Sequence, residues 1–355
     1  MLSFVLAFVL LAAVLPSAQA EGLLGYLDEL GMDGSRVPSF ARWMGREPDN
    51  QRVREDGCIV QQFRALGGNA NLYDFFMDLK SIGCSVGRLH WENGGALQFI
   101  TAVYDGNVFT ISYRPDTDTV EIVYPPASEI AILEPMFPED GGFALAGKSV
   151  LFGRYEQDND FSNDSEPIEW VIVDQAGERV LLLSRRILDV QAYNAVDDAA
   201  APATTWEGST LRAWLNREFL DTAFTASEQS ILLPVTQVTA NAGYDEITTE
   251  RVTLLRQPDV FYNVSVDFDM AMREIWPCDV APRAAARGLR LSGLSYWCAG
   301  IGAAPQYAEE GGADGGFTFP PESESLSHEI VSNNELGVRP VIWLARDTVD
   351  ALLAE

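Results

Sequence analysis

The sequence predicts an α+β protein with two domains, and three observations support this prediction. The chain has 355 residues, of which 47% are hydrophobic, which is enough for two packed cores. Alternating apolar and polar residues, typical of antiparallel strands, occur in both halves beside segments with the period of a helix. A stretch rich in Pro and Gly, residues 126–147, lies between the halves and is expected to link them.

Residues 1–20 have the pattern of a secretory signal peptide. Leu2 to Leu15 is an apolar run, and Ala18-Gln19-Ala20 gives the small-x-small pattern that precedes signal peptidase cleavage. The run is shorter than the roughly 20 apolar residues of a membrane span, although no Lys or Arg precedes it. We therefore expect cleavage before Glu21, a secreted or extracytoplasmic location and no membrane span.

The N-terminal domain, residues 21–125, is predicted as a small helix-on-antiparallel-sheet domain. It begins with a short amphipathic helix at 21–33 and a strand at 57–66. A second helix, ending near Gly83, carries apolar residues with helical spacing at Leu72, Phe75, Phe76 and Leu79. Strands of a meander are expected at 96–104, 108–113 and 120–124. The apolar face of the second helix should cover one face of this sheet.

The C-terminal domain, residues 148–347, begins with three expected strands at 150–155, 168–174 and 179–184. A helix starting at Ser209 or Thr210 places four large apolar residues on one arc, namely Leu211, Trp214, Leu215 and Phe219. A second helix begins at the capping box Thr225-Ala226-Ser227-Glu228. Residues 348–355 are expected to form a tail.

Four ordered blocks between residues 149 and 345 are rich in Trp, Gly and Pro. They are Phe152-Gly153-x-Tyr155, Glu166-Pro167-Ile168-Glu169-Trp170, Thr205-Trp206-Glu207-x-Ser209-x-Leu211-Arg212-x-Trp214-Leu215-Asn216 and Gly337-Val338-Arg339-Pro340-Val341-Ile342-Trp343-Leu344. In these blocks the chain resembles an uncharacterised domain-of-unknown-function family of exported bacterial proteins. That family is distantly similar to C-type-lectin-like folds, which include formylglycine-generating enzymes.

The resemblance implies a C-type-lectin-like C-terminal domain with a twisted antiparallel core, two helices and a long irregular loop region that presents a surface. The chain departs from the family where relatives carry Trp-Trp-Leu-Arg-Ser, because it has Tyr296-Trp297-Cys298-Ala299-Gly300 there. The stretch after it, 303–324, is rich in Gly, Glu and Pro and is expected to be a loop that either binds a ligand or has no binding role.

The net charge is −28, and every charged side chain lies after residue 20. Such a field repels nucleic acid and anionic membranes, so no nucleic-acid partner is expected. The acidity is interpreted as a solubilising surface, with attraction of cations or basic partners as the alternative.

The four cysteines of an exported chain either pair within each half, as Cys58 with Cys84 and Cys278 with Cys298, or remain buried thiols. Their spacing does not fit a zinc site, and the only histidines are His90 and His328.

Two segments could bind a ligand or a metal ion through their polar side chains. His90-Trp91-Glu92-Asn93 could hold a ligand, although a single histidine usually packs or lies at the surface. An acidic segment has oxygen-bearing side chains at the spacing of a calcium loop, at Asp158, Asp160, Ser162, Asp164, Glu166 and Glu169. Because strands are expected on both sides and Pro167 interrupts it, a solvated hairpin loop is the favoured interpretation.

Three further patterns give weaker candidates. Gln257-Pro258-Asp259 matches a calcium and sugar triplet of galactose-type lectins, with Asn333-Asn334-Glu335 as a loose companion. Ser295 lacks the second glycine of a nucleophile elbow. His328 beside Glu329 could serve as a base with its orienting group, and a polar loop is the favoured interpretation.

These observations favour a secreted or envelope-associated binding or interaction protein, whose unknown extracellular ligand is a glycan or a protein. The alternatives are an extracellular hydrolase of glycans or esters that uses acidic residues, and a structural envelope component. The sequence assigns no catalytic, cofactor-binding or metal-ligating residue and no cofactor. The helix motif at 206–220 is interpreted as core packing, and functional residues are therefore sought in the loops between Tyr296 and Leu336.

Overall fold

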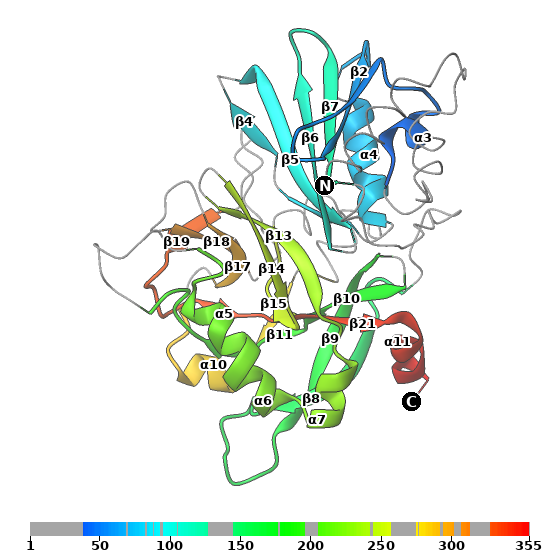
Figure 1. The fold of residues 1–355 in the computed structure, drawn as a ribbon. Coiled ribbons are helices and arrows are strands. Elements are labelled where there is room, and N and C mark those ends of the chain that lie inside the picture. Colours follow the sequence, from blue (N-terminus) through cyan, green and yellow to red (C-terminus); the bar gives the residue numbers. More distant parts are fainter. Residues whose placement is uncertain are drawn as a thin grey trace.

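The computed structural model describes residues 38–68, 70–81, 84–87, 89–92, 95–104, 106–126, 145–176, 178–195, 205–241, 244–256, 275, 277–291, 294–301, 307–312 and 327–354. The predicted signal peptide, the helix at 21–33, most of the linker and the Gln257-Pro258-Asp259 triplet lie outside these residues. Figure 1 shows the described chain as an upper, N-terminal part and a lower, C-terminal part. No helix in the described ranges is long and apolar enough to cross a membrane.

The upper part is an antiparallel sheet covered by one long helix, as predicted (Figure 1). Its strands are β1 (Asn50–Val53), β2 (Ile59–Arg64), β3 (Ser85–Val86), β4 (His90–Glu92), β5 (Leu97–Tyr104), β6 (Asn107–Arg114) and β7 (Thr119–Tyr124). They lie in the order β1-β2-β7-β6-β5-β3, with β4 also paired to β5. Two helices accompany them, α3 (Phe40–Met44) and α4 (Ala70–Ser81).

The core of this part forms between α4 and the sheet. The four apolar residues predicted to share one helix face are all buried in it, at Leu72, Phe75, Phe76 and Leu79. The sheet contributes alternate residues of its strands, such as Phe109, Ile111 and Tyr113 of β6, because successive side chains of a strand point to opposite faces. The predicted α+β class is therefore confirmed.

The lower part contains two five-stranded sheets and a separate hairpin. The first sheet has the order β15-β21-β10-β9-β8, formed by β8 (Ser149–Tyr155), β9 (Glu166–Ala176), β10 (Arg179–Ser184), β15 (Val252–Thr253) and β21 (Val341–Ala345). The second has the order β12-β20-β17-β18-β19, formed by β12 (Asp189–Val190), β17 (Ser295–Ile301), β18 (Tyr307–Gly312), β19 (Ser327–Ile330) and β20 (Gly337–Val338). The hairpin consists of β13 (Val235–Asn241) and β14 (Tyr244–Glu250), and β11 (Arg186–Ile187) pairs with β16 (Asp279–Val280).

The first sheet of the lower part is buried on both faces. In β10, Val180 and Leu182 belong to one core, and Leu181 and Leu183 belong to the other. The first core is closed by α5 (Thr210–Trp214), a π-helical turn η3 (Leu215–Phe219), α6 (Leu220–Ala223) and α11 (Arg346–Leu353), whereas α10 (Pro282–Ala286) closes the second. Strands that are covered on both faces carry continuous apolar runs, as the sequence of β10 does.

The predicted helix at 209–220 differs from the structure in one respect. It begins as expected, because the Ser209 side chain accepts a hydrogen bond from the Arg212 backbone N–H. After Trp214, however, the chain forms the π turn instead of continuing as an α-helix. A π turn inserts one residue and widens the helix locally, a feature that is frequent at functional sites. The next helix, α7 (Ala226–Ile231), has both hydrogen bonds of the predicted capping box.

Two other expectations need correction. Residues 346–353 form α11, with Val349 fully buried in the first core, so this part of the predicted tail packs on the domain. The predicted disulfides are absent, since all four cysteines are thiols. Cys58 precedes β2 and Cys84 precedes β3, and four inter-strand steps of about 4.8 Å separate these strands. This exceeds the Cα separation of about 7 Å that a disulfide can bridge. Burial raises the pKa of the Cys84 thiol well above its usual value.

Candidate functional site

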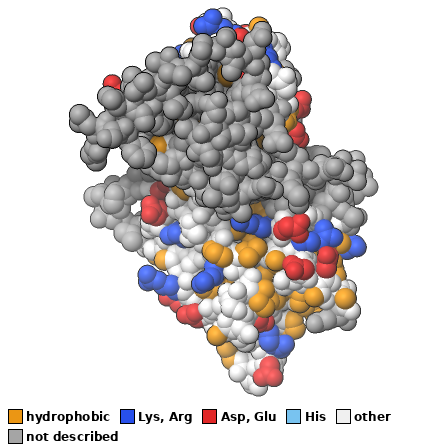
Figure 2. Space-filling view, turned by 45° about the vertical axis from the view of Figure 1, so that its right-hand side comes forward, with side chains coloured by type: hydrophobic (Ala, Val, Ile, Leu, Met, Phe, Trp, Pro, Cys, Tyr) orange, Lys and Arg blue, Asp and Glu red, His pale blue; other side chains and the backbone are white. Residues whose placement is uncertain are grey.

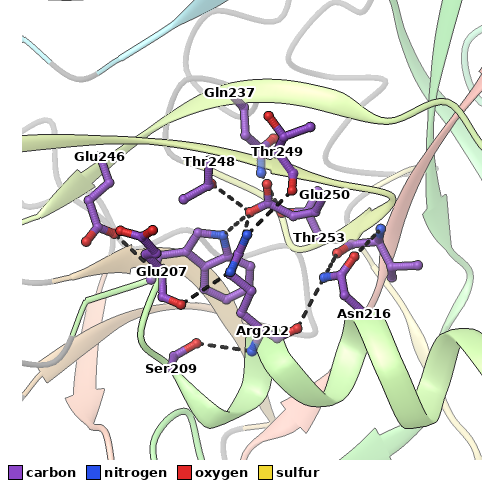
Figure 3. A network of polar contacts seen from close by, with 12 residues as sticks. Glu207, Ser209, Arg212, Asn216, Gln237, Glu246, Thr248, Thr249, Glu250 and Thr253 are labelled. Carbon is purple, nitrogen blue, oxygen red and sulfur yellow. Dashed lines mark hydrogen bonds and ion pairs between the residues drawn. The ribbon is translucent and has the colours of Figure 1, made fainter.

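A pocket lies between the π turn and the end of the β13–β14 hairpin, with a volume of about 450 Å³. It is open to solvent and is lined by Glu207, Arg212, Ala213, Asn216, Arg217, Leu220, Pro234, Thr249, Glu250 and Arg251. Figure 3 shows that its polar residues come from two sides, one set from the helix and the loop before it, the other from the hairpin. The shape of the pocket therefore depends on how the helix and the hairpin are placed relative to each other.

A buried carboxylate forms the floor of the pocket. The side chain of Glu250 is 1% exposed, and its Oε1 accepts hydrogen bonds from Trp206 Nε1 at 2.5 Å and Thr248 Oγ1 at 2.7 Å. Arg212 Nε donates to the same oxygen at 3.1 Å. A buried carboxylate needs such donors, because its desolvation is costly unless it is paired. The other oxygen, Oε2, is buried without a hydrogen-bond partner in the described part of the chain.

Two polar residues of the helix motif join the helix to the hairpin. Arg212 Nη2 donates to the backbone oxygen of Thr249 at 3.4 Å, besides its contact with Glu250. Asn216, in the π turn, donates through Nδ2 to the backbone oxygen of Val252 at 2.8 Å, and its Oδ1 accepts the backbone N–H groups of Arg251 and Val252. The side-chain amide of Asn216, seen on the helix in Figure 3, thus forms the hydrogen bonds with this strand that a neighbouring strand would form. One of its bonds fixes the backbone of Arg251, which lines the pocket.

The rim carries basic side chains. Arg217 and Arg251 are both exposed, and neither forms an ion pair with a carboxylate of the described residues. Three arginines and two glutamates line the pocket, so its local charge is positive in a chain whose net charge is −28. A basic pocket on an acidic protein attracts anionic groups locally, since the field of nearby charges dominates at short range.

The polar groups of the pocket can bind anionic groups and hydroxyl groups. Guanidinium groups bind carboxylate, sulfate or phosphate oxygens through paired N–H donors, and the exposed carboxylate of Glu207 can accept hydrogen bonds from ligand hydroxyl groups. The ten lining residues include no Ser, Cys or His that could act as a nucleophile or as its base.

In the acidic segment, residues 158–165 lie in the hairpin loop between β8 and β9, as the favoured interpretation predicts, whereas Glu166 and Glu169 belong to β9. Carboxylate oxygens of Glu156, Asp158 and Glu166 lie within 4.8 Å of one another, whereas Asp160 accepts hydrogen bonds from Ser162 inside the loop. Burial and the carboxylates of Asp158 and Glu166 raise the pKa of Glu156. The carboxylates that lie together are thus not the set that the calcium-loop spacing predicts, because Glu156 belongs to the cluster and is not part of that spacing.

His90 packs between the two parts of the protein. Its Nε2 lies 2.6 Å from Asp245 Oδ1 and its ring stacks on Phe99, with ring centroids 4.9 Å apart. These contacts support the interpretation of His90 as a packing residue.

The residues considered for nucleophilic catalysis are not brought together. Ser295 of β17 pairs with Gly312 of β18, and His328 of β19 pairs with Glu309 of β18, so β18 separates their strands and their positions are offset along it. With strands about 4.8 Å apart and about 3.4 Å per residue, the two residues lie roughly 14 Å apart. Asn333 accepts a hydrogen bond from the backbone of Glu335 and belongs to a turn.

A second buried polar cluster was not predicted from sequence. Asp189, 1% exposed, accepts a hydrogen bond from the hydroxyl of Tyr155 at 2.5 Å and pairs with Arg287 at 2.7 Å. Arg283 lies 3.4 Å from the same carboxylate and over the ring of Tyr155. Burial and the Asp189 charge raise the pKa of Tyr155. This cluster joins β8, β12 and α10 and is fully occupied by protein groups.

The pocket residues coincide with the segment that comparison with known proteins identifies. Residues 177–270 match a family model described as a domain of unknown function, DUF6273. No curated protein and no solved structure matches the chain. All ten pocket residues, from Glu207 to Arg251, lie within the matched segment. The predicted resemblance to an uncharacterised family is therefore confirmed for residues 177–270, which match the domain of unknown function DUF6273 and include the block that begins at Thr205.

Proposed function

We propose that the protein is an exported binding protein and that the pocket between the π turn and the hairpin holds the anionic group of its ligand. The observation that carries this proposal is the position of Arg217 and Arg251 at the rim, without carboxylate partners among the described residues, in a chain with more than twice as many acidic as basic residues. Arginine side chains in such a protein would meet a carboxylate easily, so two that remain available beside a pocket favour a role in recognition.

The ligand class that fits best is an acidic saccharide. Its carboxylate or sulfate would contact Arg217 and Arg251 through paired hydrogen bonds, and its hydroxyl groups would donate to the carboxylate of Glu207. A volume of about 450 Å³ lies within the range of small-molecule sites. The mixture of three arginines and two glutamates suits a ligand that carries both an anionic group and several hydroxyl groups.

The architecture of the C-terminal domain is part of the same proposal. An antiparallel sheet closed by helices, with a second sheet beside it, supports a C-type-lectin-like domain that binds its ligand on one surface. Export is supported by the signal-peptide pattern of residues 1–20. N-terminal sequencing of protein recovered outside the cytoplasm tests export, and we expect Glu21 as its first residue.

The binding test uses isothermal titration of the full mature chain with glucuronate, inorganic sulfate, inorganic phosphate and glucose. We expect binding of the anionic probes, above all glucuronate, and none of glucose. Arg217→Gln and Arg251→Gln should each weaken glucuronate binding by roughly tenfold, because each removes a charged donor.

The matched control is Arg154→Gln, which removes an exposed arginine of β8 in the same domain but outside the pocket. Equal weakening by the control would mean that net charge, and not the pocket, governs binding. No response to any anionic probe would end the proposal. Turnover of chromogenic glycosides or esters by the same preparation would favour the hydrolase alternative.

A further inference from the structure

The β13–β14 hairpin contacts both the pocket and the N-terminal domain. Figure 1 shows it reaching from the lower part toward the sheet of the upper part, and β13 contacts both β3 and β5 there. In β14, Glu246, Thr248 and Glu250 bind groups on the pocket side. Asp245 of the same strand binds the N-terminal domain. Any shift of this hairpin would therefore change the position of one wall of the pocket.

The first contact is a buried pair. The side chains of His90 and Asp245 are 8% and 6% exposed, and 2.6 Å separates His90 Nε2 from Asp245 Oδ1. The second carboxylate oxygen, Oδ2, has no hydrogen-bond partner among the described residues. The contact with His90 thus offsets the cost of burying the Asp245 carboxylate. Removal of the His90 side chain would leave Asp245 buried without this partner.

The second contact fixes the backbone of the hairpin. Ser85 Oγ of β3 accepts hydrogen bonds from the backbone N–H of Val238, at 2.9 Å, and from Arg256 Nη1, at 2.6 Å. The same guanidinium nitrogen donates to the backbone oxygen of Val238 at 3.0 Å. All three groups are buried, so the bonds are shielded from competing water. The hairpin is therefore held by its main chain as well as by side chains.

The third contact is steric. A methyl group at Gly87 would lie 2.8 Å from Val238 Cγ1 and 3.0 Å from Asp245 Oδ2, and 3.1 Å from the backbone oxygen of Thr101. Because the backbone oxygen belongs to the central sheet of the N-terminal domain, the hairpin is the element that would move. The two surfaces therefore fit closely at Gly87, and a larger residue there would require the hairpin side chains to shift.

We propose that the N-terminal domain is a positioning unit for the pocket, and that its docking through His90, Ser85 and Gly87 sets where β14 places Glu250 and Arg251. The consequence for ligand affinity rests on the proposed function. The positioning of the hairpin does not rest on the proposed function, because it can be measured without any ligand. The backbone N–H groups of Arg251 and Val252 are bonded to Asn216, and their hydrogen exchange shows whether this wall of the pocket is held in place.

The test measures hydrogen–deuterium exchange across residues 244–252 in the full chain. We expect His90→Leu and Gly87→Ala to accelerate exchange there by roughly tenfold, the effect of losing a buried charged hydrogen bond or of a displaced contact. His90→Gln should restore much of the protection, since its side-chain amide can donate to Asp245. A merely destabilised fold would not be rescued in this way.

The matched control is Lys80→Met. Within the described residues, Lys80 of α4 forms another buried ion pair between the two parts, 3.8 Å from Asp174 of β9, and neither member of this pair belongs to the hairpin. Lys80→Met should leave exchange at 244–252 close to that of the wild type. Equal acceleration by Lys80→Met, or unchanged exchange in both His90→Leu and Gly87→Ala, would overturn the positioning role.

Glucuronate titration then measures the functional consequence. His90→Leu should weaken binding by about fivefold or more, the usual size of coupling between distinct sites, and Lys80→Met should not. Accelerated exchange with unchanged affinity would show that the docking does not set the binding geometry, which overturns that half of the inference. A wild type that binds no probe would contradict the proposed function, while the exchange pattern would still decide the positioning role.

Discussion

Removal of the buried carboxylate of Glu250 should destabilise the C-terminal domain more than removal of any exposed acid. In Glu250→Ala, the indole N–H of Trp206 loses its acceptor, and this ring is fully buried. The guanidinium of Arg212 loses its carboxylate partner while it remains held beside the strand by Thr249. The hydroxyl of Thr248, which is also buried, loses the same acceptor. The variant therefore leaves two buried donors and one partly buried charge without the carboxylate that binds them.

The expected loss of unfolding free energy is about 3 kcal/mol. Breaking a buried ion pair by removing one partner costs roughly 3–5 kcal/mol, and the low end applies because the Arg212 side chain is 25% exposed and can recover part of its hydration. Glu250→Gln keeps an acceptor for Trp206 but removes the charge that faces Arg212, so about 1–2 kcal/mol is expected.

Urea unfolding followed by tryptophan fluorescence suits this measurement. Six of the eight tryptophans follow residue 148, so the signal reports mainly the C-terminal domain. Glu246→Ala is the control, because this partly exposed carboxylate on the same strand accepts a single hydrogen bond from the Glu207 backbone N–H. A Glu250→Ala variant within about 1 kcal/mol of the wild type would refute the view that this network holds the helix to the hairpin.

Three further results are expected. Gly153→Ala should destabilise the C-terminal domain by about 2–4 kcal/mol in thermal unfolding, because φ is +70° and the new methyl would lie 2.6 Å from the Phe224 ring; an unchanged midpoint would contradict this. Hydrogen bonds from Gly67 N–H and the Tyr113 hydroxyl lower the pKa of Asp118 in the folded protein. The ionised Asp118 carboxylate therefore stabilises the folded state above the ordinary Asp pKa, and this stabilisation is lost as the pH falls through the lowered pKa of the folded state. In Asp118→Asn, the free energy of unfolding should therefore fall less steeply with decreasing pH than in the wild type. Equal pH dependence in the variant and the wild type would argue against this role of Asp118. Thiol labelling of the denatured, unreduced protein should modify all four cysteines, whereas two or none would indicate disulfides.

The strands and helices with simple apolar periodicity could be predicted from the sequence. The helix with Leu72 and Phe75 and the meander with Ile111 and Ile122 each have one apolar face, and hydrophobic burial alone determines their orientation. The first strands of the C-terminal domain were predicted for the same reason. Such elements can be predicted without knowing what they pack against, because their apolar face is buried by any apolar surface.

The β13–β14 hairpin could not be predicted in this way. Its strand β13 buries Gln237 and Thr239 beside Val238, so polar residues occupy positions where a hydropathy pattern expects apolar ones. Gln237 donates to Thr253 Oγ1 at 2.6 Å, a partner on another strand. Burial of the Gln237 amide is favourable only when such a partner is in place, and that partner is known only from the tertiary structure.

The pairs between the two parts of the protein and the choice between disulfides and thiols have a related cause. His90 and Asp245 are 155 residues apart in the chain, and neither has a local signal that would connect them. The expected Cys58–Cys84 pairing used proximity in sequence, whereas the strand order places β7, β6 and β5 between the two. Sheet topology decides both outcomes, and alternation of residues does not reveal the order of strands.

The helix motif was interpreted as packing, and for its apolar residues this is correct, because Leu211, Leu215 and Phe219 are buried in the first core. The interpretation was incomplete for its polar residues. Arg212 and Asn216, each next in sequence to a buried leucine, line the pocket. A helix of regular period presents its polar side to solvent, which is why periodicity alone indicates a solvated face there.

Trp206 shows why packing and binding cannot be separated in this motif. Its ring is fully buried in the first core, yet its Nε1 donates to the carboxylate that forms the floor of the pocket. A core residue that ends in a hydrogen-bond donor transmits the rigidity of the core to a polar group at the surface, since the ring cannot move without disturbing its neighbours. Trp206→Phe should keep most of the packing and remove only this bond. If the pocket requires a fixed Glu250, this variant should weaken glucuronate binding while the unfolding midpoint changes little; unchanged affinity would show that the floor of the pocket does not depend on the core beneath it.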